Sequence, residues 1–320
     1  MNILETIEGA LRAVAYPEKP EGLYEPISYT LALGGKRIRP TLTLLAYQLY
    51  KDDVESALPA ALAIETYHNH TLLHDDLMDH AAVRRGQPTV HRKWDANTAI
   101  LSGDTMLIMS MRHALWQKCS DQGAWLDLLT RTMQEICEGQ QMDMNFEQRT
   151  DVSEEEYIEM IRLKTSVLLA CSLEAGALCA DALDADRRTL YRFGEALGLA
   201  FQLQDDWLDC YGDPAVFGKR IGGDILCGKK TYLLISAFRR ANRAQYGELL
   251  RLLSLPAKQG EERIAGVLKV YDELGVSDLA RQRIAAYTDE ALHLLDSLPV
   301  SVERKQPLRA LAEKMLRREK

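Results

Sequence analysis

Apolar residues recur every three or four positions through long segments of this chain, and no segment sustains a two-residue alternation. A repeat of three or four places an apolar stripe along one face of an α-helix, whereas a half-buried strand needs a period of two. The sequence therefore predicts an all-α fold. The expected helices cover residues 3–14, 30–33, 41–50, 59–78, 98–118, 125–146, 153–180 and 186–210, followed by four or five more amphipathic helices.

Local signals set several of the expected helix boundaries. Pro17, Pro20 and Pro26 are expected to interrupt the chain ahead of the helix at 30–33, because proline lacks the N–H that continues a helix. Ser153 and Glu156 have the spacing of a capping box and predict a helix start. No linker, low-complexity tract or short repeat separates the helices, so we expect a single domain over residues 1–320.

Composition excludes several classes of protein. With 47% hydrophobic and 27% charged residues, the 320-residue chain can bury a core of its own. Its net charge of -8 argues against a general nucleic-acid binder. No apolar run approaches the roughly 20 residues that span a bilayer, and Glu5 and Glu8 interrupt the place where a signal peptide needs an apolar run. We expect a cytoplasmic protein without nucleic-acid binding or stable membrane insertion.

One acidic motif, D-D-x-x-D, occurs twice, at residues 75–79 and 205–209. Asp75 and Asp79 lie about 40° apart around a helix and one turn along it, so both carboxylates can face one hard cation such as Mg²⁺. Each motif follows an apolar run near an expected helix C-terminus, where the helix dipole disfavours negative charge. If the two helices face each other, four carboxylates can hold metal ions that bridge to a phosphate.

Basic segments accompany both acidic motifs. Residues 35–40 (GKRIRP) place cations on a turn before a helix, Arg84 and Arg85 follow the first motif, and residues 218–230 follow the second. A turn leading into a helix N-terminus suits an anion. The pattern predicts a site for two anions, one bound through metal and one bound directly by arginine and lysine.

Taken together, these segments resemble the trans-prenyl diphosphate synthase family, over nearly the whole chain. The matching segments are GGKRIRP at 34–40, LLHDDLMDHAAVRRGQPTVH at 72–91, Lys164-Thr165, and FQLQDDWLDCYGDPAVFGKRIGGDILCGKKT at 201–231. The resemblance implies one large helical bundle of the isoprenoid synthase type with a central cavity. It also implies a homodimer and a cluster of about three Mg²⁺ ions in each active site.

The resemblance assigns roles to individual residues. It implies that the metal ligands are Asp75, Asp79, Asp205 and Asp209. It implies that isopentenyl diphosphate contacts Lys36, Arg39, His68 and Arg85. It implies that the allylic diphosphate contacts Arg84, Lys164, Thr165, Gln202, Lys219 and Lys229, of which Lys164, Thr165 and Gln202 are the catalytic group. The implied reaction condenses isopentenyl diphosphate with dimethylallyl, geranyl or farnesyl diphosphate and releases pyrophosphate.

Helix geometry leads to an expectation about product length. A prenyl tail held at Asp75 should run toward the N-terminal end of that helix, past Thr71 and His70 at one turn and Tyr67 at two turns. Neither Thr71 nor His70 is a bulky plug, so Tyr67 is the expected floor. We therefore predict a short-chain enzyme that makes C15 to C20 products, with C20 favoured; a longer-chain polyprenyl diphosphate synthase is the alternative.

Other classes of protein remain open from the sequence. A ferritin-like di-iron protein would use Glu65-x-x-His68 and Glu290-x-x-His293 as ligands. That alternative leaves both acidic motifs and the basic loops unexplained. A terpene cyclase shares one aspartate-rich helix, but it has no use for a second diphosphate site.

Overall fold

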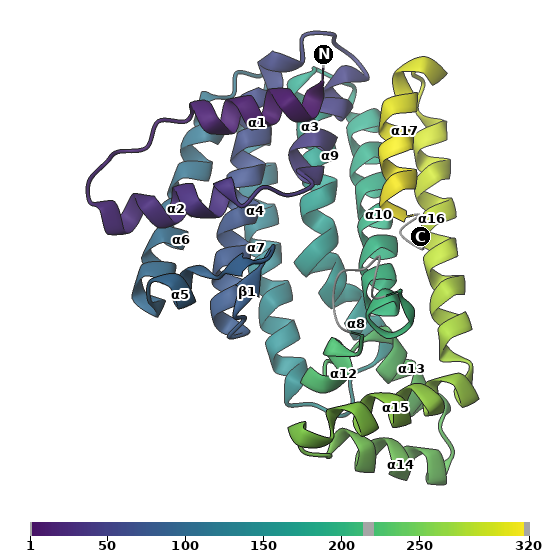
Figure 1. The fold of residues 1–320 in the computed structure, drawn as a ribbon. Helices are drawn as coiled ribbons and strands as arrows, with labels where there is room; N and C mark the ends of the chain where they lie inside the picture. Colours follow the sequence, from purple (N-terminus) through teal and green to yellow (C-terminus); the bar gives the residue numbers. More distant parts are fainter. Residues whose placement is uncertain (1, 214–220, 317–320) are drawn as a thin grey trace. The chain divides into compact units, whose positions relative to one another are not determined.

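The computed structural model describes residues 2–213 and 221–316 of the chain. It is 79% helical with almost no strand, which confirms the all-α prediction. The chain divides into two compact units, and Figure 1 labels helices of both. The expectation of one domain over residues 1–320 stays a prediction.

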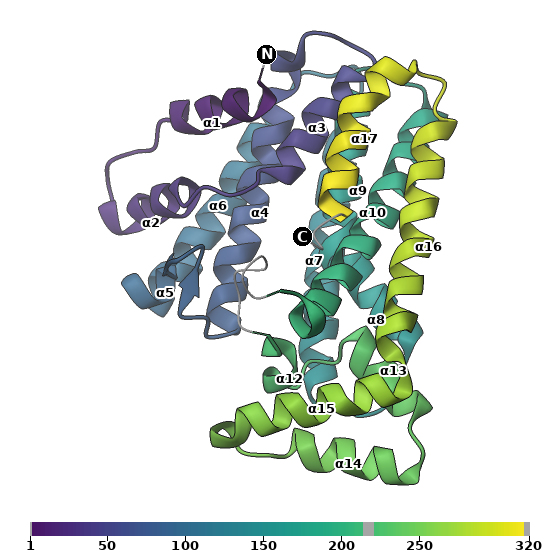
Figure 2. The same ribbon diagram turned by 45° about the vertical axis from the view of Figure 1, so that its right-hand side comes forward.

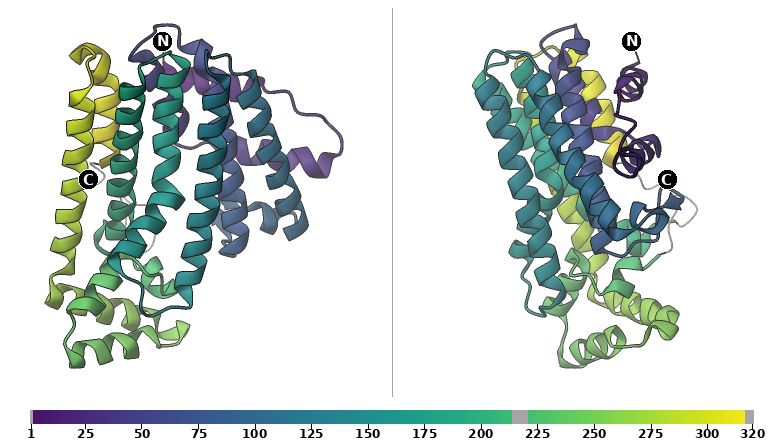
Figure 3. Two further views of the ribbon diagram at one scale, coloured as in Figure 1. Left: turned by 180° about the vertical axis from the view of Figure 1, so that it is seen from behind. Right: turned by 90° about the vertical axis from the view of Figure 1, so that its left-hand side faces the viewer.

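Unit 1 consists of residues Met1–Thr130, Cys171–Leu190 and Val300–Arg304. Its complete elements are α1 (Ile3–Ala13), α2 (Glu21–Ala32), α3 (Ile38–Gln48), η1 (Val54–Ala57), α4 (Leu58–Met78), β1 (Val83–Arg84), β2 (Gln87–Pro88), α5 (Val90–Lys93) and α6 (Ala96–Trp116). The long helices α4 and α6 pack side by side, as the view from behind also shows (Figure 3). Ser110 of α6 donates a hydrogen bond to the carbonyl of Ala63 at 2.7 Å and so fixes the register of this pair.

Unit 2 consists of Arg131–Ala170, Tyr191–Pro299 and Lys305–Lys320. Its complete elements are α8 (Glu154–Ile161), the π-helical turn η2 (Arg162–Ser166), α12 (Gly223–Cys227), α13 (Tyr232–Arg240), α14 (Arg243–Leu253), η3 (Ala257–Gln259), α15 (Gly260–Leu274) and α16 (Val276–Ser297). Helices α7 (Gln122–Glu147), α9 (Val167–Cys179), α10 (Asp184–Tyr211) and α17 (Val302–Leu316) have residues in both units. Helices α14 and α15 pack against each other (Figure 2).

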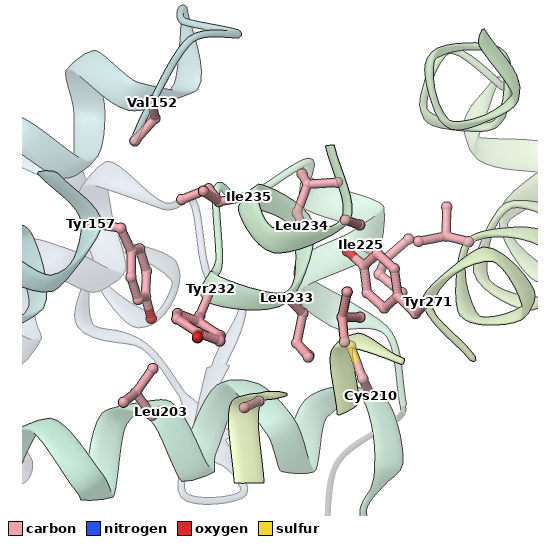
Figure 4. Packing of buried hydrophobic residues seen from close by; sticks show 14 of the residues in the cluster. Val152, Tyr157, Leu203, Cys210, Ile225, Tyr232, Leu233, Leu234, Ile235 and Tyr271 are labelled. Atoms are coloured by element: carbon pink, nitrogen blue, oxygen red, sulfur yellow. The ribbon is translucent and has the colours of Figure 1, made fainter. Parts of the chain in front are cut away.

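The core of unit 2 forms where α8, α10, α12, α13 and α15 meet. Figure 4 shows Tyr157 of α8 and Tyr232 of α13 in this core, together with Tyr271 of α15. All three rings are buried, and Leu203 and Cys210 of α10 pack in the same cluster. This core therefore carries the part of α10 that contains the second acidic motif.

The helix expected over residues 153–180 is interrupted. Its start is confirmed: the Glu156 amide donates to Ser153 Oγ at 3.1 Å, and the Ser153 amide donates to Glu156 Oε2 at 2.9 Å. The chain then changes from α8 to the π-helical turn η2 at Arg162–Ser166 before α9 begins. A π-helical turn is rare and often lies at a functional site, and this one contains Lys164 and Thr165.

The expectation that Pro26 interrupts the chain is wrong. Helix α2 starts directly after Pro20 and continues through Pro26, although proline removes one helical hydrogen bond at a cost of about 3 kcal/mol. Pro26, Ile27 and Leu31 are buried in unit 1, and this burial offsets the loss. No helix among the described residues is both long and apolar enough to cross a membrane.

Candidate active site

The turn between α2 and α3 is fastened to three helices by Arg37. Its Nε donates to Glu8 Oε1 on α1 at 2.8 Å, its Nη1 to Glu65 Oε1 on α4 at 2.7 Å, and its Nη2 to the Leu31 carbonyl at 2.6 Å. The backbone of Arg37 is left-handed, with φ 46°, and its side chain is 1% exposed. Burial alone would lower the pKa of Arg37, but Glu65 and Glu8 outweigh that effect and raise it.

This anchored turn brings Arg39 to His68 of α4. Arg39 Nη1 lies 3.2 Å from His68 Nε2. Burial lowers the pKa of Arg39 to about 10, with Glu65 opposing this shift and the charge of Arg85 contributing to it. Burial and the charges of Arg39 and Arg85 also hold the pKa of His68 well below its usual range. Positive charge is therefore in excess here, which favours binding of an anion.

Arg85 reaches the same turn from a β-hairpin. Strands β1 and β2 pair with Arg84 opposite Gln87, and the two residues between them, Arg85 and Gly86, both have positive φ, 53° and 76°. Two positive φ values are the geometry of a tight hairpin turn, and Gly86 adopts it at little cost. From this turn Arg85 Nη1 donates to the Gly34 carbonyl. One turn thus brings together three of the residues predicted to contact isopentenyl diphosphate. Lys36 lies in the turn, Arg39 lies at the start of α3 directly after it, and Arg85 donates to it.

The hairpin also returns Arg84 to the first acidic motif, at the C-terminal end of α4. Arg84 Nε donates to Asp76 Oδ2 at 2.7 Å, and its Nη2 lies 3.9 Å from Asp75 Oδ2. Burial raises the pKa of Asp76, and Arg84 partly opposes that shift. Asp75 is half-buried and Asp79 is exposed. The buried middle aspartate therefore holds Arg84 in place, beside the two outer carboxylates.

In unit 2 the second acidic motif has a similar buried middle residue. Asp206 accepts a hydrogen bond from Tyr157 of α8 and another from Gln202 Nε2 at 3.0 Å. The pKa of Asp206 is raised to about 8, chiefly by burial and then by the carboxylate of Asp224, against the opposing hydrogen bonds from Tyr157 and Gln202. Burial is thus the main reason that this carboxyl resists ionisation.

Residues 222–224, where α12 begins, pack onto Asp209. Asp209 Oδ2 accepts the amide of Asp224 at 3.0 Å, and the Asp209 carbonyl accepts the amide of Gly222 at 2.7 Å. The Lys229 amide donates to the Asp224 carbonyl at 3.0 Å. Lys229, which is predicted to contact the substrate, therefore lies just after α12 and close to the residues that pack on Asp209. Lys219, the other predicted lysine, lies outside the described residues.

The π-helical turn η2 presents the predicted catalytic group. Lys164 Nζ donates to Asp143 Oδ2 of α7 at 2.6 Å, and Thr165 Oγ1 donates to Gln202 Oε1 at 3.1 Å. A Cβ at Gly139 of α7 would lie 2.4 Å from the Lys164 amide nitrogen, so only glycine permits this approach. Gln202 in turn donates to Asp206, which links the catalytic group to the second acidic motif.

The residues expected to limit product length lie along α4. Tyr67 is 1% exposed, and its ring centroid lies 5.5 Å from that of His70. His70 Nδ1 lies 2.9 Å from the Gly103 carbonyl of α6, and burial followed by the neighbouring His74 lowers the pKa of His70 to about 4. Thr71 is half-buried, and its hydroxyl donates to the His68 carbonyl at 2.8 Å. Tyr67 and His70 therefore form one packed pair on α4.

The donor set fits magnesium bound together with a substrate. Within residues 2–213 and 221–316, no three His, Cys, Asp or Glu side chains are grouped closely enough to hold a metal ion by themselves. Mg²⁺ commonly takes only one or two carboxylates and completes its shell with water and substrate phosphate oxygens. Paired carboxylates next to cationic side chains match that mode of binding.

A cavity of about 330 Å³ lies elsewhere in unit 2. It is lined by residues of the α7–α8 connection, of the start of α8, of the segment before α13 and of α13 itself, including Val152, Lys230, Phe238 and Arg239. None of the predicted site residues lines it. One of its acidic wall residues, Glu154, pairs with Arg283 at 2.7 Å.

Comparison with known proteins identifies the family. The polyprenyl synthetase family model matches residues 20–271 of the chain. The chain belongs to the polyprenyl synthetase family. It is 42% identical over 262 residues to the short chain isoprenyl diphosphate synthase of Methanocaldococcus jannaschii, covering 82% of this chain and 79% of that protein. It is 37% identical over 317 residues to the geranylgeranyl diphosphate synthase of Methanosarcina mazei, covering 98% and 95%.

Solved structures of polyprenyl synthetases agree with this placement. A crystal structure of a geranylgeranyl pyrophosphate synthase matches with a TM-score of 0.93 at 40% identity and covers 100% of both chains. The geranylgeranyl pyrophosphate synthetase of Pyrococcus horikoshii matches with a TM-score of 0.90 at 32% identity, covering 99% and 95%. The predicted family and fold are confirmed, and the di-iron alternative is set aside. Glu65 and His68, its proposed ligands, instead contact Arg37 and Arg39.

Three residues important to this arrangement received no role from the sequence. They are Arg37, which anchors the basic turn, Tyr157, which binds Asp206, and Asp224, which packs its backbone on Asp209. Tyr157 and Asp206 are 49 residues apart, so no local pattern reports their contact. The sequence contains one indication for Arg37. It is one of three cationic residues in the short segment 36–39, and a ligand does not need all three.

Replacing Arg37 tests its anchoring role. Arg37→Met leaves Glu65 charged and buried, so we expect the free energy of unfolding to fall by about 3–5 kcal/mol. Replacing both members, in Arg37→Met with Glu65→Met, should recover much of that loss because no buried charge is left unpaired. Urea denaturation measures both.

The matched control for Arg37 is its exposed neighbour Lys36. Lys36→Met should change stability by no more than about 0.5 kcal/mol. An Arg37→Met protein as stable as Lys36→Met would show that the buried pair does not hold the turn.

Proposed function

We propose that this polyprenyl synthetase is a short-chain trans-prenyltransferase that condenses isopentenyl diphosphate with an allylic diphosphate to give C15 to C20 prenyl diphosphates and pyrophosphate. One observation carries the proposal. In unit 1 the hairpin sets Arg85 on the cationic turn and Arg84 on the first acidic motif, so adjacent residues serve an anion site and a carboxylate site. Two neighbouring diphosphates need that combination.

Isopentenyl diphosphate is the anion proposed for the cationic turn. Lys36, Arg39, His68 and Arg85 would contact its phosphates directly. The lowered pKa values of Arg39 and Arg85 support this role, because a bound diphosphate would stabilise their charged forms. Guanidinium groups also match phosphate oxygens with two parallel hydrogen bonds.

The allylic diphosphate is proposed to bind at the acidic motifs. Asp75 and Asp79, with Asp205 and Asp209, would hold Mg²⁺, and Arg84, Lys164, Lys219 and Lys229 would contact the phosphate oxygens. When bound, Mg²⁺ would neutralise the diphosphate and so make it a better leaving group. Arg84, held by Asp76, and Lys164, held by Asp143, would orient that group for departure.

The residues of the π-helical turn are proposed to protect the allylic cation. The hydroxyl of Thr165 and the amide oxygen of Gln202 are paired at 3.1 Å. Both present partial negative charge without the nucleophilic carboxylate that the cation could alkylate. The double bond of isopentenyl diphosphate would attack the cation, and the released pyrophosphate would accept the final proton.

The direct test is incubation of the purified protein with isopentenyl diphosphate and Mg²⁺, with dimethylallyl, geranyl or farnesyl diphosphate added singly. Chromatography of the dephosphorylated products should show C15 and C20 alcohols, with C20 in excess. Products of C30 or longer would favour the longer-chain alternative. Cyclic hydrocarbon, or no product from any starter, would contradict the proposal.

Removing one carboxylate from either motif tests the metal assignment. Asp75→Ala and Asp205→Ala should each lower kcat by on the order of 10³-fold at saturating Mg²⁺, because metal-held leaving groups contribute several kcal/mol to the barrier. Asp127→Ala, an exposed aspartate on α7, is the control and should retain wild-type kcat. Near-normal turnover in either motif variant would contradict a shared role.

Product length is proposed to depend on the Tyr67 and His70 pair. Each prenyl unit adds roughly 4–5 Å, close to the ~5.4 Å pitch of the helix, so moving the floor by one turn should change the product by about one unit. Tyr67→Ala should shift the main product one unit longer, and His70→Phe should shift it toward C15.

Tyr67→Phe keeps the ring and is the matched control, with an unchanged product distribution. Product chromatography under identical conditions compares the three variants. Unchanged products in both Tyr67→Ala and His70→Phe, with activity retained, would place the length limit on other residues.

We also propose that the enzyme is a cytoplasmic homodimer joined through α6. Leu101, Ile108 and Leu115 repeat every seven residues on this helix and are 59%, 62% and 61% exposed, with Ile100 and Trp116 beside them. An apolar stripe of about 20 Å is the kind of surface that a two-fold interface buries.

Sedimentation velocity tests the dimer. Ile108→Lys should convert a dimer to a monomer, since it places two charges in the interface. Leu183→Lys alters an equally apolar side chain, 72% exposed and outside α6, and should remain dimeric. A monomeric wild-type protein would contradict the proposal.

A further inference from the structure

In unit 2, helix α10 contacts the segment from α8 to η2 at three successive turns. A Cβ at Gly198 would lie 2.6 Å from the Cα of the last residue of η2, so the two backbones meet there. Four residues later, Gln202 Oε1 accepts a hydrogen bond from Thr165 Oγ1 at 3.1 Å. Four residues later again, Asp206 accepts the hydroxyl of Tyr157. Residues spaced by four lie on one face of a helix, so one face of α10 makes all three contacts.

The hydrogen bonds on this face form one chain with a fixed direction. Tyr157 donates to Asp206 Oδ2, and Gln202 Nε2 donates to Asp206 Oδ1 at 3.0 Å. A carboxylate accepts hydrogen bonds and cannot donate them, so the Gln202 nitrogen faces Asp206 and the Gln202 oxygen faces Thr165. Thr165 gives its hydroxyl proton to Gln202. The chain thus sets the direction of the Gln202 amide dipole and leaves the Thr165 oxygen as an acceptor.

The Tyr157 end of this chain is deeply buried. Tyr157 is 2% exposed and Asp206 is 6% exposed. Tyr157 packs in the same core as Leu203, and Figure 4 shows its hydroxyl pointing toward the helix that carries Leu203. A buried carboxylate needs protein donors because water does not supply them. The bonds from Tyr157 and Gln202 stabilise the ionised form of Asp206 against its burial, so a side chain fixed by core packing holds this carboxylate.

We propose that Tyr157 is a positioning residue for prenyl transfer, which acts through Asp206 and Gln202 to orient the oxygens that stabilise the allylic cation. This inference rests on the proposed function, in which Thr165 and Gln202 face that cation. A dipole stabilises a transition state most when it is oriented before the charge develops. Without the Tyr157 hydroxyl, Asp206 can rotate and the Gln202 amide loses its fixed direction.

The first test is Tyr157→Phe, which removes the hydroxyl and keeps the buried ring. It should lower kcat by about 10- to 100-fold, because dipoles that face the cation act on the transition state. The KM of each substrate and the half-saturating Mg²⁺ concentration should stay within about twofold, because neither diphosphate nor metal is held by this chain. Wild-type kcat in Tyr157→Phe, or a rise in KM without a loss of kcat, would overturn the proposal.

Tyr232→Phe is the matched control. Tyr232 is a buried tyrosine of the same core and lies on α13. Its loss of a hydroxyl should leave kcat within about twofold of wild type, because exposed and core sites outside such a network change little when volume is kept. An equal loss of kcat in Tyr157→Phe and Tyr232→Phe would show a general effect of core hydroxyls and would overturn the specific role of Tyr157.

A double-mutant cycle separates positioning from a general effect on packing. Gln202→Leu removes the amide through which Tyr157 acts. Adding Tyr157→Phe to Gln202→Leu should therefore lower kcat by less than about twofold further. Independent effects would multiply instead, so a further loss as large as that of Tyr157→Phe alone would overturn the proposal.

The proposed function and this inference fail in different ways. A wild-type protein that makes no product from any starter contradicts the proposed function. The same cycle is then measured by urea denaturation, where non-additive free energies of unfolding support the link from Tyr157 to Gln202 and additive ones overturn it. If Tyr157→Phe does not fold, Asp206→Asn replaces it, because an amide has one acceptor oxygen and cannot accept both hydrogen bonds. Wild-type kcat in Asp206→Asn would overturn the proposal.

Discussion

The ion pair between Arg37 and Glu65 is the constraint on which the cationic turn of unit 1 depends. Both side chains are almost fully buried, 1% and 2% exposed, so neither charge can be left without the other. The pair fixes the turn between α2 and α3 against α4. Asn69 Nδ2 also donates a hydrogen bond to Glu65 Oε1 at 2.9 Å. Because Arg37 engages this carboxylate directly, Arg39 and Arg85 remain the cations best placed to meet a ligand.

Both acidic motifs follow the same physical plan. The middle aspartate is buried and binds a protein partner, Arg84 for Asp76 and Tyr157 for Asp206. In the first motif the outer residues are less buried than the middle one. A buried, hydrogen-bonded centre can orient its neighbours without itself competing for a ligand. This division of roles holds for the first motif, whereas in the second the outer residue Asp209 is also buried and accepts the Asp224 amide.

Features with local determinants could be predicted from the sequence. The Ser153 capping box and the position of the acidic motif at the end of α4 follow from spacing within a few residues. Features that depend on packing between segments far apart in the chain could not be predicted from it. The π-helical turn at Lys164 depends on Gly139, 25 residues earlier in the chain. Because Gly139 has no side chain, α7 can approach the backbone of Lys164 closely. The role of Arg37 depends on partners 29 and 28 residues away in the sequence.

One calorimetric measurement tests whether the anchored turn of unit 1 binds a diphosphate directly. Isopentenyl diphosphate is titrated into the protein in magnesium-free buffer. Arg39→Gln should raise Kd at least 10-fold, about 1.4 kcal/mol, whereas Arg12→Gln, an exposed arginine on α1, should leave Kd unchanged. Equal affinity in wild type and Arg39→Gln would contradict the claim that excess cationic charge on this turn forms the binding site.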